Sequence, residues 1–321
     1  MLINKYKLII SALIIFVLIY MLDTNEILIL VRQAEIGYLL LSLFVVTISR
    51  IVMAIKWQVL LRAVDISIGF CDIVKTYYVS TFLGVFLPPT IGADAVRAYS
   101  VSKKGYNLHK IISSIVIERF IGMIVLLMFC MISGLILIKE VFYGQINSYY
   151  YNFISIILFT TASVFFLITF NTNINSKIHK ILNNNDNSEK YLNIKKSIMS
   201  LQESYVSYKE SKCALINFAA LTILENIVKI YSVYFVILAF NLDVKFIYIL
   251  SIVPIITVFT RLPLSIDGIG IHEGGYAFFL SLIGYSMSYG FSIGAVNHLV
   301  SLIAIAPGAI FYSTEKVDND M

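Results

Sequence analysis

Apolar runs long enough to cross a lipid bilayer recur along this 321-residue chain. A helix of about 20 apolar residues spans the hydrocarbon core, and only helices and closed barrels satisfy their own backbone groups there. Hydrophobic residues make up 59% of the chain and charged residues 13%, whereas soluble domains are about a quarter charged. The sequence therefore predicts an all-α polytopic integral membrane protein. The runs of spanning length cover residues 8–22, 36–55, 111–138, 149–170, 213–240, 246–260 and 290–312.

Two shorter apolar segments, 72–88 and 274–287, adjoin breaks that are rich in proline and glycine. The chain has about seven membrane segments if they are half-helices or re-entrant hairpins, and up to nine if they are spans. We expect one membrane domain over residues 1–321, with halves at about 1–170 and 213–312. The polar segment 171–212 joins the halves.

The two breaks place polar backbone inside apolar sequence. Residues 261–275 read RLPLSIDGIGIHEGG, and residues 87–97 read LPPTIGADAVR. Irregular backbone at membrane depth is tolerated only where protein or a water-filled cavity surrounds it, and ionisable groups there are functional by default. The two segments align over a few residues, as the two halves of an internal repeat would. Interrupted helices in corresponding places are typical of a transporter binding site.

Basic residues predict the topology. Lys5 and Lys7 place the N-terminus in the cytoplasm under the positive-inside rule. The re-entrant interpretation of residues 72–96 is favoured because it leaves the flanking basic residues on one side of the membrane. We therefore read the net charge of +5 as a topology signal and expect no nucleic-acid partner. The flanking basic residues are Lys56, Arg62, Arg97, Lys103, Lys104 and Lys110.

The polar segment 171–212 contains seven lysines and is predicted to be cytoplasmic. Its apolar residues recur at alternating steps of four and three, which indicates one face of a helix. This helix either packs on the bundle as a linker or lies at the membrane surface, against anionic headgroups or a partner. The apolar face consists of Ile194, Ile198, Leu201, Tyr205 and Tyr208.

At the first break, Pro88 and Pro89 stop a helix, and a new one is expected to start near Gly92. Asp94 and Arg97 then lie one turn apart on one face. Free amides at a helix start, together with a planar guanidinium, suit a phosphate. Alternatively, Arg97 is a cytoplasmic anchor.

Charged residues also occur inside the predicted spans. Glu118 and Arg119 are adjacent in sequence and cannot face each other on a helix, so each needs a partner elsewhere in the bundle. Arg50 is a candidate partner for Glu118. A structural ion pair and a ligand contact both remain open. Glu225 and Lys229 have the spacing of a self-contained pair.

At the second break, Arg261 comes first, and Gly268 and Gly270 can expose backbone amides. Glu273 is expected in the first turn of the next helix, where it either caps the helix or contacts substrate. His272 is weak support for a metal because no second histidine lies at ligand spacing. The three cysteines have no CxxC spacing. We therefore expect no metal, no cofactor and no catalytic set.

These motifs together resemble the lysylphosphatidylglycerol synthase transmembrane-region family, also called the flippase-like domain family. The resemblance rests on PPTIGADAVRAYSVSKKG, on IERFIG at 117–122 and on RLPLSIDGIGIHEGG. Asp267 stands where the family usually has a glycine. The matching residues are Pro88, Gly92, Arg97, Glu118, Arg119, Pro263, Gly268, Gly270 and Glu273.

The resemblance implies a protein that moves a phosphate-containing or aminoacylated lipid, such as lysyl-phosphatidylglycerol or a polyprenyl-linked glycan, across the cytoplasmic membrane. Arg97 and Arg119 would meet phosphate and Glu273 would balance charge. Two alternatives remain: a membrane-embedded transferase of the phosphatidylglycerol lysyltransferase type, and an accessory subunit of a cell-envelope pathway. The expected partners are the lipid and a separate synthase or glycosyltransferase.

Overall fold

A computed structural model describes residues 24–87, 92–141, 208, 211–261, 265 and 267–320. The described residues form helices joined by short turns, and no strand occurs among them. The helices are α2 (Thr24–Gln33), α3 (Ile36–Ala63), α4 (Phe70–Phe86), α5 (Gly92–Ser102), α6 (Leu108–Val141), α10 (Lys212–Ala239), α11 (Phe246–Thr260), α12 (Ile271–Leu282), α13 (Met287–Ile305) and α14 (Pro307–Asp320).

Four helical segments of the described chain are long and apolar enough to cross a bilayer: α3, Leu108–Leu137 of α6, α10 and Met287–Thr314. They correspond to four of the predicted runs, which confirms a polytopic helical membrane protein. The predicted runs at 8–22 and 149–170 lie outside the described residues. The prolines of the two breaks, Pro88, Pro89 and Pro263, also lie outside them. Of the polar segment 171–212, the structure describes Tyr208, Ser211 and Lys212.

The prediction of a complete span at residues 246–260 needs correction. These residues do form α11, but the helix has only 15 residues. At 1.5 Å per residue this is about 22 Å, which is less than the roughly 30 Å of a hydrocarbon core. The helix instead packs against α12, so the two form a hairpin of half-helices.

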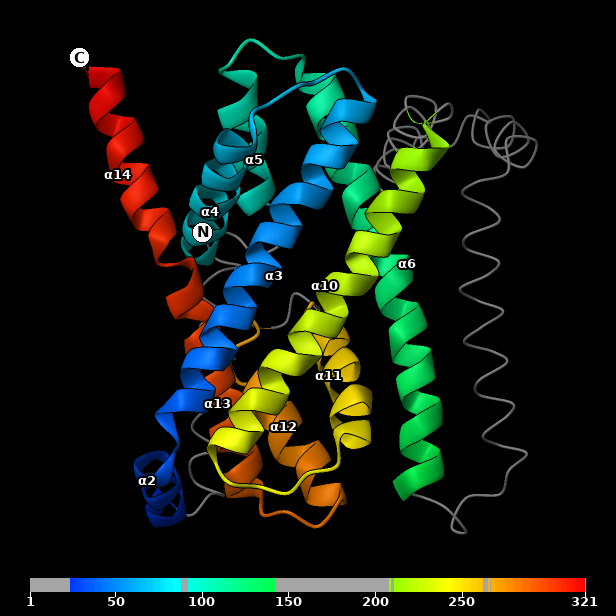
Figure 1. Ribbon diagram of the computed structural model, residues 1–321, viewed down its shortest axis with the longest axis vertical. Coiled ribbons are helices and arrows are strands. Elements are labelled where there is room, and N and C mark those ends of the chain that lie inside the picture. The colour runs from blue at the N-terminus through cyan, green and yellow to red at the C-terminus, as the bar shows by residue number, and fades with distance from the viewer. Residues whose placement is uncertain are drawn as a thin grey trace, which may run out of the picture.

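Helices α4 and α5, which flank the first break, form a corresponding hairpin. Helix α4 enters the bundle, and α5 returns to the end from which α4 came (Figure 1). The outer ends of the two helices are tied together, because the Tyr106 hydroxyl donates to the carbonyl of Ser67 at 2.6 Å. At the tip, a Cβ on Gly84 would lie 2.8 Å from the Cβ of Ala93. The re-entrant course predicted for residues 72–96 is thus present in the described parts of this segment.

The second hairpin enters from the opposite end of the bundle (Figure 1). The turns that flank it are joined there by a 2.7 Å bond from the Tyr285 hydroxyl to the carbonyl of Asp243. The order helix, hairpin, helix therefore occurs twice. It runs through α3, α4–α5 and α6, and then in the opposite direction through α10, α11–α12 and α13.

Apolar side chains pack inside the bundle and also cover its outer surface. One buried cluster surrounds Trp57 between α3, α4 and α6, and a second joins α10, α11, α12 and α13. On α3, large apolar side chains at steps of four residues face outward, as expected for a surface whose solvent is lipid. This outward face consists of Ile36, Leu40, Phe44 and Ile48.

Tyr208 is the one residue of the predicted 194–208 stripe that the structure describes. It is fully buried, and its hydroxyl donates to the carbonyl of Leu60 at 2.8 Å. This end of the stripe therefore packs on the bundle, at the end of α3.

Candidate functional site

The tip of the first hairpin faces a polar cavity of about 180 Å³ inside the bundle. Helices α3, α4, α5, α6 and α10 contribute to its wall, and Arg261 closes it from the end of α11. The residues that line it are Met53, Lys56, Tyr77, Ser80, Thr81, Ala93, Asp94, Arg97, Glu118, Arg119, Gly122, Thr222, Glu225, Asn226 and Arg261.

Arg97 is the centre of the charged wall. Its guanidinium donates to Glu118 at 2.7 Å and to Asp94 at 2.5 Å, and its side chain is 3% exposed. The planar group also lies 4.7 Å from the Trp57 ring and 4.8 Å from the Tyr77 ring, within the range of cation–π contact. Arg97 is thus a buried structural cation with two carboxylate partners.

Asp94 joins the two arginines. It lies in the first turn of α5, where a carboxylate is favoured by the helix dipole. Arg119 reaches it from α6 with two bonds, at 2.9 Å from Nε and 3.0 Å from Nη2. The Arg119 side chain is 50% exposed, so part of this guanidinium remains free to meet another anion.

A second charged group faces the cavity from α3 and α10. Glu225 binds Lys229 at 2.5 Å, as its spacing predicted, and it also binds Lys56 from α3. Lys56 and Glu225 are both buried. The pair is therefore not self-contained, because a cation from another helix shares the carboxylate.

The cavity wall has an excess of cations. Four basic and three acidic side chains line it, and each carboxylate has at least one cationic partner among them. Arg261 is exposed and forms no ion pair with any residue that the structure describes. Arg261 and the outer half of Arg119 are therefore the groups best placed to bind an anion.

A separate polar group forms where α12 begins. Asp267, Gly268 and Gly270 have φ values of 50°, 76° and 86°, so the chain turns through left-handed backbone before the helix. Aspartate tolerates this conformation better than most residues, so Asp267 fits the turn. Glu273 lies in the first turn and accepts a 2.6 Å bond from the Gly270 amide, which confirms the predicted capping role.

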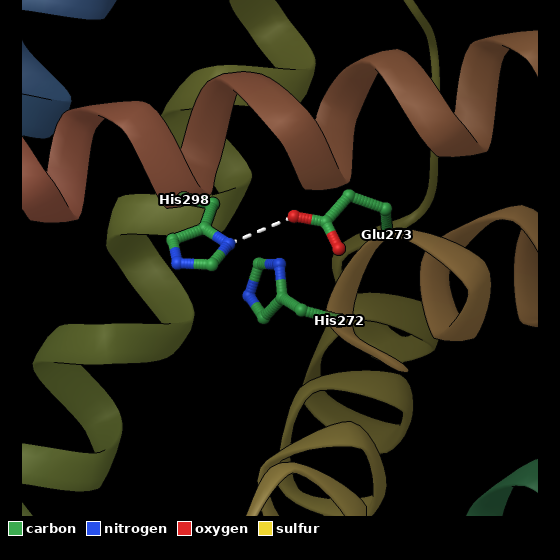
Figure 2. A group of neighbouring side chains, drawn as sticks. All are labelled: His272, Glu273 and His298. Atoms are coloured by element: carbon green, nitrogen blue, oxygen red, sulfur yellow. Dashed lines mark hydrogen bonds and ion pairs between the residues drawn. The ribbon is translucent and has the colours of Figure 1, made fainter. Parts of the chain in front are cut away.

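His298, on α13, completes this second group. Its Nδ1 lies 2.8 Å from Oε1 of Glu273, and its Nε2 lies 3.5 Å from Oδ2 of Asp267. His272 lies beside it, with 5.3 Å between the ring centroids and an angle of 59° between the ring planes. Figure 2 shows the side chains of His272, Glu273 and His298 converging.

The structure separates the predicted site residues into two groups. Asp94, Arg97, Glu118, Arg119 and Arg261 line the cavity, and Gly92 begins the helix that carries two of them. Among the second-break residues that the structure describes, only Arg261 lines this cavity. The remaining predicted residues, Gly268, Gly270, His272 and Glu273, belong to the group at α12.

The structure changes three expectations about the basic residues. Arg50 is not the partner of Glu118, which binds Arg97 and the Tyr77 hydroxyl; the Arg50 guanidinium lies 3.8 Å from the Met53 sulfur. Lys56 is not a boundary residue, because α3 continues two turns past it to Ala63. Arg97 is not a surface anchor, because it is buried.

The sequence reasoning did not find His298, nor the aromatic wall of Trp57 and Tyr77. His298 lies 25 residues from Glu273, so only the antiparallel packing of α12 and α13 brings them together. A histidine inside an otherwise apolar predicted span was the available signal, since polar residues in spans mark interior faces.

Comparison with known proteins is consistent with this architecture. A UPF0104 membrane protein of Pyrococcus horikoshii is 24% identical over 136 residues, which is 41% of this chain and 41% of that protein. The matched part is thus less than half of the relative's length. The sequence model of the lysylphosphatidylglycerol synthase transmembrane region matches residues 5–308, nearly the whole chain. The protein therefore belongs to the lysylphosphatidylglycerol synthase transmembrane-region family.

Proposed function

We propose that this protein translocates a lipid with a phosphate-bearing headgroup across the cytoplasmic membrane. The observation that supports this most is the cavity with excess positive charge at the tip of a re-entrant hairpin, inside a bundle whose outer surface is apolar. Lysyl-phosphatidylglycerol and polyprenyl-linked glycans both present a phosphate. A separate synthase or glycosyltransferase supplies the lipid in this proposal.

Arg119 and Arg261 bind the phosphate in this proposal. Both guanidinium groups line the cavity and both are exposed, so binding there does not require a buried ion pair to break. A guanidinium matches phosphate geometry with two parallel bonds. The first turn of α5 also faces the cavity through Ala93 and Asp94, which adds the positive end of a helix dipole. Arg97 holds Asp94 and Glu118 in place behind these contacts.

The cavity volume limits what enters. The cavity's volume of about 180 Å³ is smaller than the roughly 300–1,000 Å³ of pockets that enclose a whole small molecule. In this conformation the cavity therefore fits the phosphate end of a headgroup, and the acyl or prenyl chains stay in the surrounding lipid.

The arrangement of the hairpins suits access from both sides. The end that holds the outer ends of α4 and α5 has the cluster Arg62, Lys103, Lys104 and Lys110, so the positive-inside rule assigns it to the cytoplasm. The second hairpin then enters from the outer face. Opposed interrupted helices that meet near the middle of the membrane are the architecture of alternating-access transporters. We assign Arg261 to the junction between the two hairpins because it leaves α11 and lines the cavity of α4–α5.

Reconstituted vesicles test the proposal. The full-length protein is inserted into liposomes with acyl-labelled phosphatidylglycerol or lysyl-phosphatidylglycerol, and transfer between leaflets is followed by quenching from outside. We expect faster transfer with wild-type protein, and a loss of more than tenfold in Arg119→Ala and Arg261→Ala. Lys104→Ala, which removes an exposed cation outside the cavity, is the matched control and should transfer normally.

Two results would reject a translocase. One is the absence of accelerated transfer for these lipids and for a polyprenyl-phosphate glycolipid. The other is the appearance of a new lipid species by thin-layer chromatography when cells express the protein with its donor, which would establish the transferase alternative.

A further inference from the structure

We propose that His272, Glu273 and His298 form a binding site for a divalent first-row transition metal, with Zn²⁺ as the best match. One ligand atom from each residue lies within 4.8 Å of the other two. Two imidazoles and one carboxylate form a common zinc-binding set. This inference concerns the group at the start of α12 and does not depend on lipid transport.

The two ring nitrogens of His298 face different carboxylates, as the ring nitrogens of a metal-binding histidine do when one binds the ion and the other donates to an outer partner. Nδ1 of His298 faces the Glu273 carboxylate at 2.8 Å, and its Nε2 faces Asp267 at 3.5 Å. A ligating histidine usually gives its other N–H to a carboxylate, which fixes the ring orientation. His298 thus has Glu273 beside its metal-facing nitrogen and Asp267 as the outer partner.

The two ring nitrogens of His272 also have different surroundings. Its Nε2 lies 3.3 Å from Nδ2 of Asn297. When that amide is turned by 180°, its Oδ1 takes this place and accepts from an Nε2–H, which leaves Nδ1 unprotonated. Its Nδ1 is buried and has no hydrogen-bond partner among the described residues. A buried polar atom without a partner costs free energy, and a metal ion would satisfy it. Figure 2 shows a ring nitrogen of His272 turned toward the contact between His298 and Glu273.

The group needs a small adjustment to bind an ion. Ligand atoms of a tetrahedral zinc ion lie about 3.3 Å apart, given metal–ligand distances near 2.0 Å. The 2.8 Å contact of His298 with Glu273 therefore opens by about 0.5 Å, and the His272 ligand atom moves inward by up to about 1.5 Å. Access is available on the side of Asp267, which is 45% exposed, whereas His298 and Glu273 are 13% and 8% exposed.

A metal here would join the tip of the second hairpin to α13. Glu273 and His272 lie in the first turn of α12, and His298 lies on α13. Since the same carboxylate caps α12 through Oε2, its other oxygen remains for the metal. The bound ion would fix the left-handed turn at Asp267 against α13.

Metal content of the purified full-length protein tests the site. The protein carries a histidine-free affinity tag, is stripped with EDTA and is dialysed against Zn²⁺ or Co²⁺. We expect about one ion per chain and, with Co²⁺, the visible absorption of four-coordinate nitrogen and oxygen ligation. His272→Gln, His298→Gln and Glu273→Gln should each lower the affinity more than a hundredfold. Asp267→Asn, which removes only the outer partner, should lower it 10–100-fold.

His109→Gln is the matched control, because His109 is an exposed histidine on α6 that belongs to no such group within the part of the chain that the structure describes. It should bind metal like the wild type. Thermal unfolding of the metal-free proteins separates ligand loss from misfolding: the variants should unfold with the metal-free wild type, and only wild type and His109→Gln should gain stability with Zn²⁺. Absence of bound metal in the wild type, or full binding by His298→Gln and His272→Gln, would overturn the proposal.

Discussion

Arg97 on α5 and Glu118 on α6 form a buried ion pair, with 2.7 Å between Nη1 and Oε2. The pair connects the returning half of the first hairpin to a membrane-spanning helix. The Trp57 and Tyr77 rings lie against the guanidinium, so little water reaches it. Removing one partner of such a pair leaves an uncompensated charge, whereas replacing both with apolar groups is often tolerated.

We therefore predict that Arg97→Met lowers the free energy of unfolding by about 3–5 kcal/mol, and that Arg97→Met/Glu118→Leu regains most of the loss. Unfolding in mixed detergent micelles, followed by circular dichroism, measures both. Lys104→Ala is the control, because it breaks an exposed ion pair with Asp72. The Lys104 side chain is 39% exposed and the Asp72 side chain 53%, so the loss of this pair should cost at most about 1 kcal/mol. A double variant as unstable as Arg97→Met would show that the pair itself contributes the stability.

The shared carboxylate of Glu225 gives a second prediction. Lys229→Met leaves the buried contact of Glu225 with Lys56 intact, so it should destabilise the protein only modestly. Glu225→Gln leaves two neighbouring ammonium groups without their anion, and we expect a loss at least twice as large. The same micelle unfolding compares them, with the exposed Lys212→Met as control. Equal losses for Lys229→Met and Glu225→Gln would contradict the sharing.

Membrane physics explains why the spans were predictable. In a bilayer each backbone group must be satisfied within its own segment, so the length of an apolar run alone predicts α3, α6 and α10. Local spacing was also sufficient for Asp94 and Arg97, which are three residues apart, and for Glu225 with Lys229.

Contacts between distant helices could not be predicted in the same way. The apolar residues of α3 are spread around its circumference, so its sequence does not show that Lys56 faces α10 or that Arg50 faces away from Glu118. That rotation is set by packing, which is why Arg50 was wrongly paired with Glu118. The contact of His298 with Glu273 likewise depends on how α12 folds back on α13.

The close packing of α12 on α13 depends on Gly290. A Cβ at this position would lie 2.5 Å from the carbonyl oxygen of Tyr276 and 2.6 Å from Cα of Ala277, and backbone cannot move aside cheaply. We predict that Gly290→Ala costs about 1–3 kcal/mol. In Gly134→Ala, the control on α6, nothing lies within 4 Å of the new methyl group, and a gain of about 0.5–1 kcal/mol is expected. Melting temperatures in detergent distinguish these outcomes, and a neutral Gly290→Ala would exclude the tight crossing.

Asp267 allows a backbone effect to be separated from a side-chain effect. Its φ of 50° is left-handed, so alanine there is strained by about 1–2 kcal/mol and glycine is not. Asp267→Ala and Asp267→Gly both lose the contact with His298, and the difference between them therefore reports the backbone alone. We predict that the glycine variant is more stable than the alanine variant by about 1 kcal/mol.

Asp243 is the matched control for this comparison, because it is exposed and is not among the residues with positive φ. There the order should reverse, with Asp243→Ala equal to or more stable than Asp243→Gly, since glycine loses more conformational freedom on folding. Unfolding of the four variants under one set of conditions provides the comparison. If alanine were as stable as glycine at position 267, the left-handed turn before α12 would not exist in the folded protein, and the approach of Asp267 to His298 would need another geometry.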